Sequence, residues 1–438
     1  MKNSFITVIG AGLAGCETAQ IIARAGVPVR LIEMKPQKKS PAHESDLFAE
    51  LVCSNSLKAE RLTSAAGLLK AEMQLFGSLC VESAYSCRVP AGGALAVDRE
   101  LFSSFITKKI RENPLIEVVS GEAECIPDSS ENICVVATGP LTSDSLAADI
   151  SKHIGEKMLS FYDAAAPIVT GESVDPEYSF AAARYGRGDD DYINCPMDKE
   201  QYTAFYRELV SAECALPEKT DEGIRLYEGC MPIERMAKRG EDTIRFGPLK
   251  PVGLTDPKTG RRPYAVVQLR QENADGKLFN LVGFQTNLKF GEQKRVFSMI
   301  PALHSAEFMR YGVMHRNTFI DSPRVLKADF SLKSEPNIFF AGQITGVEGY
   351  MESAASGILA GINAVRRFKN NEPFILPGES MMGALAHYIS DESVSHFQPM
   401  GANFGILPSI GGIRDKQERY AALSARAIEI VKGLVNNG

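Results

Sequence analysis

A glycine-rich turn near the N-terminus constrains the fold more than any other feature of the sequence. The run Phe5–Ile9 (FITVI) has the pattern of a strand, and a helical pattern follows the turn as far as Ala25. A second strand-like run, Val29–Ile32, ends at Glu33. This order of strand, turn, helix, strand and acid predicts a dinucleotide-binding site of the Rossmann type. The turn consists of Gly10, Ala11, Gly12, Leu13, Ala14 and Gly15.

Each part of this motif has a physical role in binding a dinucleotide. Gly10 makes the tight turn, Gly12 lets a pyrophosphate approach the backbone, and Gly15 lets the helix pack closely on the strand. The amide groups at the helix N-terminus attract the pyrophosphate, and Glu33 can accept a hydrogen bond from the ribose. The alternative is a glycine turn without a ligand, which the flanking elements make the weaker interpretation.

Two later segments favour FAD over NAD as the bound dinucleotide. Ile133–Gly139 (ICVVATG) is a strand-like run ending in Ala-Thr-Gly, which resembles the segment that passes under the cofactor in glutathione-reductase-like flavoproteins. Asn337–Gly342 (NIFFAG) leads into a glycine-rich turn and a helix, like the distal flavin segment of that superfamily. Gln343 stands where the superfamily usually has Asp, and its amide can still hydrogen-bond a ribityl chain. The predicted contacts in these segments are Thr138, Gly139, Gly342, Gln343, Gly349, Tyr350 and Met351.

The positions of the flavin segments, at both ends of the chain, predict an inserted domain between them. We expect an α/β fold, a glutathione-reductase-like FAD-binding domain made of residues 1–165 and 330–438. Residues 166–329 would form an inserted α+β domain, with a helix over Lys199–Ala212 and a strand over Tyr264–Leu269. Because no second glycine fingerprint follows, we expect no dedicated nicotinamide domain, and NADH or NADPH would reduce the flavin at its open face.

Charge is distributed unevenly along the chain. The net charge of −6 argues against a protein that coats nucleic acid non-specifically. Between Arg235 and Arg270, however, nine Lys and Arg residues stand against three Asp and Glu, with Arg261 and Arg262 adjacent. Such a patch can bind phosphates or can be a solvated charged face, and the sequence leaves both interpretations open.

The nine cysteines and the N-terminus indicate the compartment. Nothing at the N-terminus resembles a secretion signal, and no apolar run reaches membrane-spanning length. We therefore expect a cytoplasmic protein with reduced thiols and no membrane contact. No Cys-x-x-Cys pair and no zinc-type spacing occurs, so we expect no metal site.

Two of the cysteines have neighbours that favour chemistry over packing. Cys53 lies in ELVCSNSLK and Cys230 in YEGCMPIER, among polar and charged residues. Reactive thiols favour such surroundings. Cys125 and Cys134, on strand-like runs, and Cys16, in the first helix, are predicted to be packed in the core.

Six segments resemble the folate- and FAD-dependent tRNA (uracil-5-)-methyltransferases, the TrmFO family. The resemblance extends from the N-terminus through Ile362. In its flavin part the chain is also similar to the larger GidA (MnmG) tRNA-modification proteins, whose extra C-terminal helical domain this chain is too short to carry. The segments are GAGLAGCETA, ELVCSNSLKAE, YEGCMPIERMA, LVGFQTNLKFGEQKRVF, RYGVMHRNTFI and FAGQITGVEGYMESAASG.

The resemblance implies methyl transfer to carbon-5 of a uridine in the T-loop of tRNA. Methylenetetrahydrofolate would supply the carbon, and reduced FAD would carry it and supply electrons. A thiolate that adds to carbon-6 of uracil activates carbon-5, and the resemblance assigns this role to Cys230, with Cys53 as the flavin-side partner. These two roles stay open to exchange. His315 is the candidate for stacking on the folate.

The uridine must leave its loop to reach the flavin, and the basic insertion would then hold the T-arm. Three alternatives stay open: the same chemistry on ribosomal RNA, a flavin oxidoreductase of a small molecule, and a non-catalytic FAD-bound RNA-binding protein.

Overall fold

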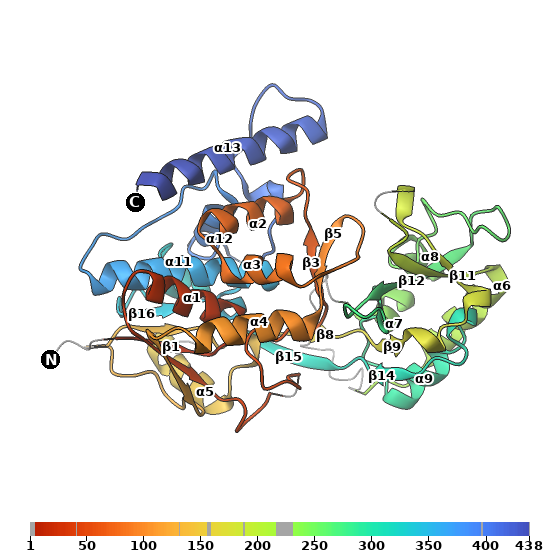
Figure 1. Cartoon of the computed structure of the whole chain (residues 1–438), viewed down its shortest axis with the longest axis horizontal. Helices are drawn as coiled ribbons and strands as arrows, with labels where there is room; N and C mark the ends of the chain where they lie inside the picture. The colour runs from red at the N-terminus through yellow and green to blue at the C-terminus, as the bar shows by residue number, and fades with distance from the viewer. Residues whose placement is uncertain are drawn as a thin grey trace.

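The chain forms two lobes, one of which holds both chain ends (Figure 1). The side chains of residues 160–163, 315, 316 and 437 lie outside the described part of the structure. The computed structural model describes residues 5–40, 42–130, 132–155, 159–186, 189–215, 231–395 and 397–437.

A parallel sheet forms the centre of the lobe with the chain ends, which we call the nucleotide lobe. Its strand order is β16-β7-β1-β2-β6, and every pair is parallel. Strands β1, β7 and β16 are wholly buried, as expected where both faces of a parallel sheet are covered. The predicted α/β class with a Rossmann-type sheet is confirmed. The strands are β1 (Ile6–Ile9), β2 (Val29–Glu33), β6 (Ile116–Ser120), β7 (Cys134–Val136) and β16 (Ile338–Phe340).

Two helices from opposite ends of the chain pack tightly beside this sheet. Helix α1 (Leu13–Arg24) follows the glycine turn, and α11 (Tyr350–Phe368) follows β16. Their backbones approach closely because Gly357 has no side chain: a Cβ atom there would lie 2.3 Å from Ala14 O. The Thr18 hydroxyl donates to Gly357 O at 2.9 Å across the same contact. The nucleotide lobe is therefore closed by segments from both ends of the sequence.

A small antiparallel sheet and further helices complete the nucleotide lobe. The sheet has the order β3-β5-β4 and faces the other lobe (Figure 1). Its strands are β3 (Ser56–Ala59), β4 (Arg88–Val89) and β5 (Ala94–Val97). The helices are α2 (Ala65–Leu75), α3 (Leu79–Ser86), α4 (Arg99–Arg111), α5 (Asp144–Ile154), α10 (Ser322–Val325), α12 (Met381–Tyr388) and α13 (Lys416–Asn437).

The middle of the chain forms the second lobe, which we call the insertion lobe. Its sheet has the order β10-β11-β12-β13-β9-β14, and all its pairs are antiparallel. It has a hydrophobic core of its own. The strands are β9 (Ile168–Thr170), β10 (Phe180–Ala181), β11 (Tyr192–Met197), β12 (Ala265–Gln271), β13 (Leu278–Leu281) and β14 (Phe308–Arg310). The helices are α6 (Lys199–Ser211), α7 (Ile233–Lys238), α8 (Glu241–Phe246) and α9 (Phe290–Phe297).

Two antiparallel strands, β8 (Leu159–Ala164) and β15 (Met314–Phe319), carry the chain between the lobes. Phe319, Ile320 and Leu326 then pack in the core of the nucleotide lobe. The chain thus re-enters that core at residue 319, before the predicted boundary at 330, because these apolar side chains are buried there. The division at 165/166 stays a prediction.

The prediction for Cys134 is confirmed, and the one for Cys125 is wrong. Cys134 is buried in β7, whereas Cys125 is exposed in the connection before it. Gly121, with φ of 155°, follows the end of β6, and of residues 121–126 only Ile126 is buried. A short run of mixed polarity therefore forms a loop here.

Within the described ranges, no helix is long and apolar enough to cross a membrane. The same residues contain no cluster of three or more His, Cys, Asp or Glu side chains suited to a metal ion.

Candidate active site

A pocket lies where β1 and β2 end at the carboxyl edge of the parallel sheet. Its walls come from the glycine turn, from the segment after β7 and from the start of α11. Of the predicted cofactor contacts, Gly15, Gly349 and Met351 are not in its lining. Those that line it are Gly10, Ala11, Gly12, Leu13, Ala14, Glu33, Thr138, Gly139, Gly342, Gln343 and Tyr350.

The three glycines of the turn differ in what surrounds them. A Cβ atom on Gly10 would lie 2.8 Å from Ala137 O, and one on Gly15 would lie 1.8 Å from Gly10 O. At Gly12 no atom lies within 4 Å of that position. Gly10 and Gly15 are therefore required for packing, whereas Gly12 leaves space for a ligand in front of α1, whose N-terminus has no side-chain cap. This opening fits the pyrophosphate of a dinucleotide.

Glu33 connects the second strand to the turn. Its Oε2 atom accepts from the Ala11 N–H at 2.7 Å, and its Oε1 atom accepts from the Lys35 N–H at 3.0 Å. The carboxylate is buried and borders the pocket. It therefore fixes the turn, and its remaining lone pairs are placed for a ribose hydroxyl.

The distal segment is held by its own polar contacts. Gln343 Nε2 donates to Glu348 Oε2 at 2.7 Å, and the Gly342 N–H donates to Ser356 Oγ at 2.7 Å. Gly349 has φ of 124°, and a Cβ atom there would lie 2.1 Å from Glu352 Oε2. Gly349 thus shapes the start of α11 rather than the pocket wall, and Met351 is buried in the core.

Tyr350, the first residue of α11, connects the pocket with Cys53. Its hydroxyl oxygen accepts from the Cys53 N–H at 2.7 Å and from the Ser54 N–H at 3.2 Å. Burial raises the pKa of Tyr350 well above its usual value, and the neighbouring Cys53 raises it further. The phenol therefore stays neutral. Cys53 itself is half-buried and follows Val52, which lines the pocket.

Arg270 holds the residues that follow Cys53, a contact that the sequence analysis missed. Its Nη2 atom donates to Ser54 Oγ at 2.8 Å, and its Nε atom donates to Asn55 Oδ1 at 2.9 Å. Asn55 Nδ2 in turn donates to Gln271 O at 2.9 Å. Arg270 ends the basic stretch that begins at Arg235, but it is only 7% exposed and is therefore not part of a basic surface. We call residues 51–55 the Cys53 loop. A strand of the insertion lobe thus fixes the position of this loop.

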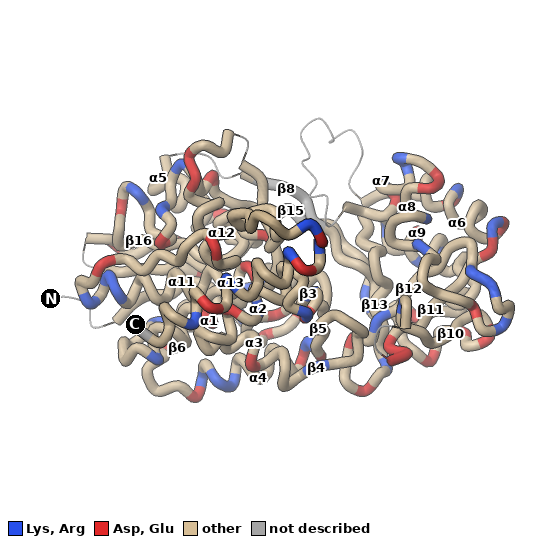
Figure 2. Tube along the Cα trace, turned by 90° about the horizontal axis from the view of Figure 1, so that it is seen from above, with Lys and Arg blue, Asp and Glu red and all other residues tan. Residues whose placement is uncertain are grey.

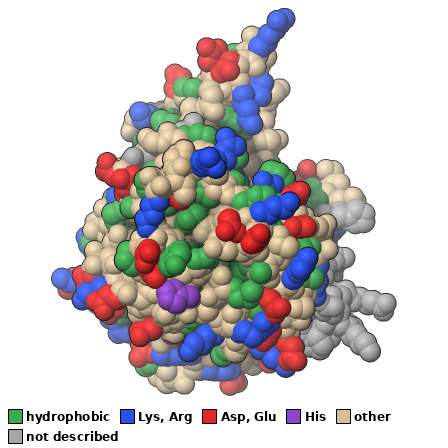
Figure 3. Space-filling model, turned by 90° about the vertical axis from the view of Figure 1, so that its right-hand side faces the viewer, with side chains coloured by type: hydrophobic (Ala, Val, Ile, Leu, Met, Phe, Trp, Pro, Cys, Tyr) green, Lys and Arg blue, Asp and Glu red, His purple; other side chains and the backbone are tan. Residues whose placement is uncertain are grey.

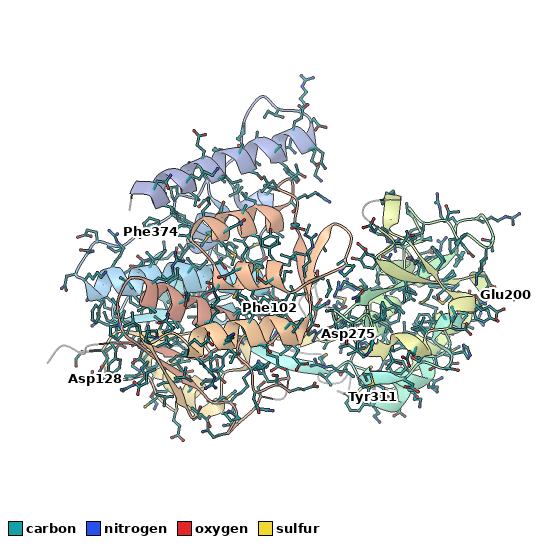
Figure 4. The ribbon with its side chains drawn as sticks, viewed as in Figure 1. Phe102, Asp128, Glu200, Asp275, Tyr311 and Phe374 are labelled. Atoms are coloured by element: carbon teal, nitrogen blue, oxygen red, sulfur yellow. The ribbon has the colours of Figure 1, made fainter. Side chains whose placement is uncertain are left out.

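Two further contacts strengthen this junction between the lobes. Arg99 Nη1 donates to Leu51 O at 2.9 Å, and the Arg99 guanidinium pairs with Glu272, which directly follows β12. The Ala274 N–H donates to Asp98 Oδ2 at 2.9 Å. Asp275, next in the chain, lies where the lobes meet (Figure 4). The segment 270–274 therefore docks on the Cys53 loop and on the start of α4.

Cys230 falls in the segment 216–230, outside the described residues. Described residues on either side of it bind the same stretch of the insertion lobe: the Ala215 N–H donates to Asn287 O, and the Ile233 N–H donates to Gln285 O, both at 2.7 Å. Glu234, buried in α7, accepts from the Asn287 N–H at 2.8 Å. The described residues on the two sides of the Cys230 segment, Ala215 and Ile233, are therefore both held by residues 285–287.

The predicted folate contact, His315, lies in β15, where its backbone pairs with Asp163 of β8. Its side chain lies outside the described part. The strand itself belongs to the connection between the two lobes.

Arg261 and Arg262 lie at the far end of the insertion lobe. They are exposed and share a surface hollow with Met197, the last residue of β11. At the other end of β11, about 17 Å away for an extended strand, the Tyr192 hydroxyl donates to Ala91 O of the nucleotide lobe. Figure 3 shows acidic and basic side chains interspersed over this end of the molecule, and Figure 2 shows the same mixture along both lobes. None of the nine cations lines the pocket.

Comparison with known proteins assigns the chain to a family. It matches the family model described as Glucose inhibited division protein A over residues 5–372. A protein of Acetivibrio thermocellus named methylenetetrahydrofolate–tRNA-(uracil-5-)-methyltransferase TrmFO is 58% identical over 433 residues, 99% of each chain. The chain belongs to the TrmFO family. A TrmFO of the same name from Ligilactobacillus salivarius is 56% identical over 98% of both chains.

Solved structures show that this TrmFO chain shares its fold with GidA. The structure of Aquifex aeolicus GidA in its form I crystal superposes with a TM-score of 0.71 at 16% identity. The match covers 99% of the TrmFO chain and 76% of GidA. The resemblance to TrmFO and GidA predicted from the six sequence segments is confirmed.

Proposed function

We propose that the protein transfers a one-carbon unit from methylenetetrahydrofolate to carbon-5 of a uridine in the T-loop of tRNA, forming 5-methyluridine. The observation that carries this proposal is the 58% identity, over 99% of both chains, to a protein named for this activity. The pocket supports it, because it fits a dinucleotide and opens beside a half-buried cysteine.

FAD, when bound in the pocket, would carry the carbon unit and supply the reducing electrons, with NADH or NADPH as the source of hydride. The residues that would hold it are those of the glycine turn, Glu33, Thr138–Gly139 and Gly342–Gln343. The opening at Gly12 and the uncapped helix end would bind the pyrophosphate. Met351 and Gly349 would act indirectly, through the position of α11.

The two cysteines would act on the uracil ring. The thiolate of Cys230 adds to carbon-6, the electron pair of the carbon-5–carbon-6 double bond moves toward carbon-5, and carbon-5 becomes a nucleophile. After the carbon unit is attached, the thiolate of Cys53 accepts the carbon-5 proton, and loss of the Cys230 thiolate restores the double bond. The attached unit becomes a methyl group by accepting a hydride equivalent from reduced FAD. The contact of the Cys53 backbone with Tyr350, a residue of the pocket wall, supports the flavin-side role for Cys53.

The remaining substrate contacts are proposals of the same kind. His315 would stack on the folate. Arg261 and Arg262 would bind tRNA phosphates distant from the modified loop, since they lie at the far end of the insertion lobe. Replacing both with Gln would then lower the salt dependence of tRNA binding, by about one unit of slope for each lost phosphate contact.

One reconstitution tests the reaction. The protein is mixed with NADPH, methylenetetrahydrofolate and a tRNA transcript, and the RNA is digested and analysed for 5-methyluridine. We expect product at the T-loop uridine, none without folate, and none when that uridine is replaced with cytidine. Product on a ribosomal RNA fragment, with none on the tRNA, would identify ribosomal RNA as the substrate. Flavin reduction without methylated RNA would favour a small-molecule oxidoreductase.

The thiols are tested with RNA that carries 5-fluorouridine, which traps the enzyme attached to carbon-6. We expect a covalent adduct with the wild type and none with Cys230→Ala. Cys53→Ala should still form the first bond but lose turnover. Cys125→Ala, which removes an exposed thiol, is the matched control. Normal methylation by both Cys53→Ala and Cys230→Ala would contradict the thiol mechanism.

A further inference from the structure

Three aromatic rings stack in a row on the insertion lobe, outside the pocket. The ring centroids of Phe290 and Tyr311 are 5.0 Å apart with planes at 14°, and those of Tyr311 and Phe308 are 5.5 Å apart with planes at 8°. Phe308 packs against the core of the lobe, whereas Phe290, at the other end of the row, is 54% exposed. We call these three residues the aromatic row. Because Tyr311 covers one face of Phe290, the exposed part of that ring includes the opposite face.

The geometry of the row matches a particular kind of ligand. Single exposed apolar side chains are common on proteins and have no special meaning. Here, however, the rings are parallel, and the series ends on an open face supported from behind by two further rings. Successive nucleobases stack on aromatic side chains in this parallel arrangement. The row therefore suits a planar base, which would continue the series beyond Phe290.

The row lies close to the stretch that flanks the Cys230 segment. Phe290 begins α9 and directly follows residues 285–289, to which Ala215 and Ile233 are bonded. Phe290 is five positions after Gln285, a span of at most about 18 Å. Arg310, next to Tyr311, reaches Glu44 of the nucleotide lobe at 3.4 Å. Tyr311 accordingly lies on the part of the insertion lobe nearer the junction (Figure 4).

Two of the cations beside the row, Lys289 and Arg295, are paired with acids. Lys289 Nζ lies 2.6 Å from Glu213 Oε2. Arg295 pairs with Glu208 at 2.5 Å and with Glu292 at 2.8 Å. Neutralised cations contribute little to phosphate binding, and the part of the binding that Phe290 supplies would come from ring contact, which does not depend on salt.

We propose that the aromatic row is a stacking site for an unpaired base of the RNA substrate, a neighbour of the uridine that is modified. This inference rests on the proposed function. When a base leaves its loop, its neighbours lose a stacking partner, which costs free energy. Phe290 replaces that partner and so lowers the cost of presenting the uridine to the thiols.

The test uses a T-arm stem-loop RNA with the fluorescent base 2-aminopurine beside the target uridine. Stacking on a ring quenches this base, so binding and base contact are measured in one titration. We expect Phe290→Ala to weaken binding about 5- to 150-fold and to remove the quenching, with an unchanged slope of affinity against salt. Phe290→Trp should retain both affinity and quenching, and Phe290→Leu should not. Phe246→Ala, at a 63% exposed ring on α8, is the matched control and should bind like the wild type.

Several outcomes would overturn the inference. Equal affinity and quenching in the wild type and Phe290→Ala would exclude base stacking while leaving the proposed function intact. A changed salt slope would mean that Phe290 acts through charged neighbours. A raised KM for methylenetetrahydrofolate with unchanged RNA affinity would place the folate on the ring. Failure of the wild type to bind or methylate the RNA would overturn both this inference and the proposed function.

Discussion

The hydroxyl oxygen of Tyr350 lies 2.7 Å from the backbone nitrogen of Cys53, although the two residues are 297 positions apart in the chain. One end of this contact is in the pocket wall and the other is at the predicted flavin-side thiol. The phenol at the start of α11 is therefore one of the groups that hold the thiol in position, together with Arg270.

Replacing Tyr350 with Phe should separate cofactor binding from turnover. The ring remains in the pocket wall, so flavin absorbance should be retained. The Cys53 and Ser54 N–H groups lose their acceptor, which should lower the stability of the fold by about 1–3 kcal/mol and displace the thiol. We expect slower methylation, measured on tRNA at saturating folate. Tyr388→Phe removes a hydroxyl that donates to Gln398 O and should leave turnover unchanged; unchanged turnover in Tyr350→Phe as well would contradict this role.

Arg270 should be a positioning residue for the same loop. Arg270→Ala removes the donors to Ser54 and Asn55, and we expect a loss of roughly 2–4 kcal/mol of stability and a lower rate of methylation. Millimolar guanidinium should restore part of the rate, because it can replace the missing planar donor group. Arg270→Lys should not substitute, since an ammonium lacks the fork of two parallel donors.

The measurement compares alkylation of Cys53 and Cys125 by iodoacetamide. The Cys53 rate should change in Arg270→Ala and recover with guanidinium, while that of the exposed Cys125 stays constant. Arg262→Ala, at an exposed arginine of the same lobe, should change neither the alkylation rate of Cys53 nor that of Cys125. A loss of activity that guanidinium leaves unaltered would point to a structural role alone.

The two glycines at the start of α1 should respond differently to the same change. Gly12→Ala places a methyl group in open space at the predicted pyrophosphate site, so the protein should fold with little flavin. Gly15→Ala places it 1.8 Å from Gly10 O, so folding itself should fail or the thermal midpoint should fall steeply. Flavin absorbance and thermal unfolding distinguish the two results. Full flavin content in Gly12→Ala would show that the cofactor lies elsewhere.

Glu72 should make stability depend on pH. It is fully buried and accepts from the Met381 N–H at 2.7 Å and the Met382 N–H at 2.8 Å. Burial raises its pKa from 4.5 to about 7. Between these values the folded state retains a proton that the unfolded state has lost, so stability falls as pH rises from 4.5 to 7, by about 3 kcal/mol in all.

Glu72→Gln should remove this dependence. The amide has one acceptor oxygen, so one of the two N–H groups stays unpaired at every pH, which gives a constant cost of about 1–3 kcal/mol. The difference in thermal midpoint between wild type and variant should therefore change across pH 4.5–7 and level off above it. A difference that stays constant over this range would disprove the raised pKa.

Local patterns predicted the nucleotide lobe well for a physical reason. The glycine turn, the strand beside it and the acid at Glu33 act within a few tens of residues, so their spacing is visible in the sequence. The short run at Cys125 shows the limit of such patterns, because a few apolar residues do not distinguish a strand from a loop. Whether Cys125 is exposed depends on which other segments of the fold pack over this run.

The junction at Arg270 could not be predicted in this way. It joins residues 215 positions apart, and its side chain points to the nucleotide lobe only because β12 pairs with β11 and β13 in a particular register. A count of charges assigned it to the basic surface. The aromatic row likewise joins a helix start to a strand, and nothing in the spacing of Phe290 and Tyr311 indicates that their rings are parallel.

The contact between Thr18 and Gly357 spans 339 residues, and this has a consequence for how the protein is made. At a synthesis rate of about 5–20 residues per second, α1 emerges from the ribosome roughly 20–70 seconds before the helix that covers it. During that time its apolar side is exposed, and the wall formed by Gly342 and Tyr350 does not yet exist. We expect the nascent chain to need chaperone protection and to acquire its flavin only late in synthesis or after release.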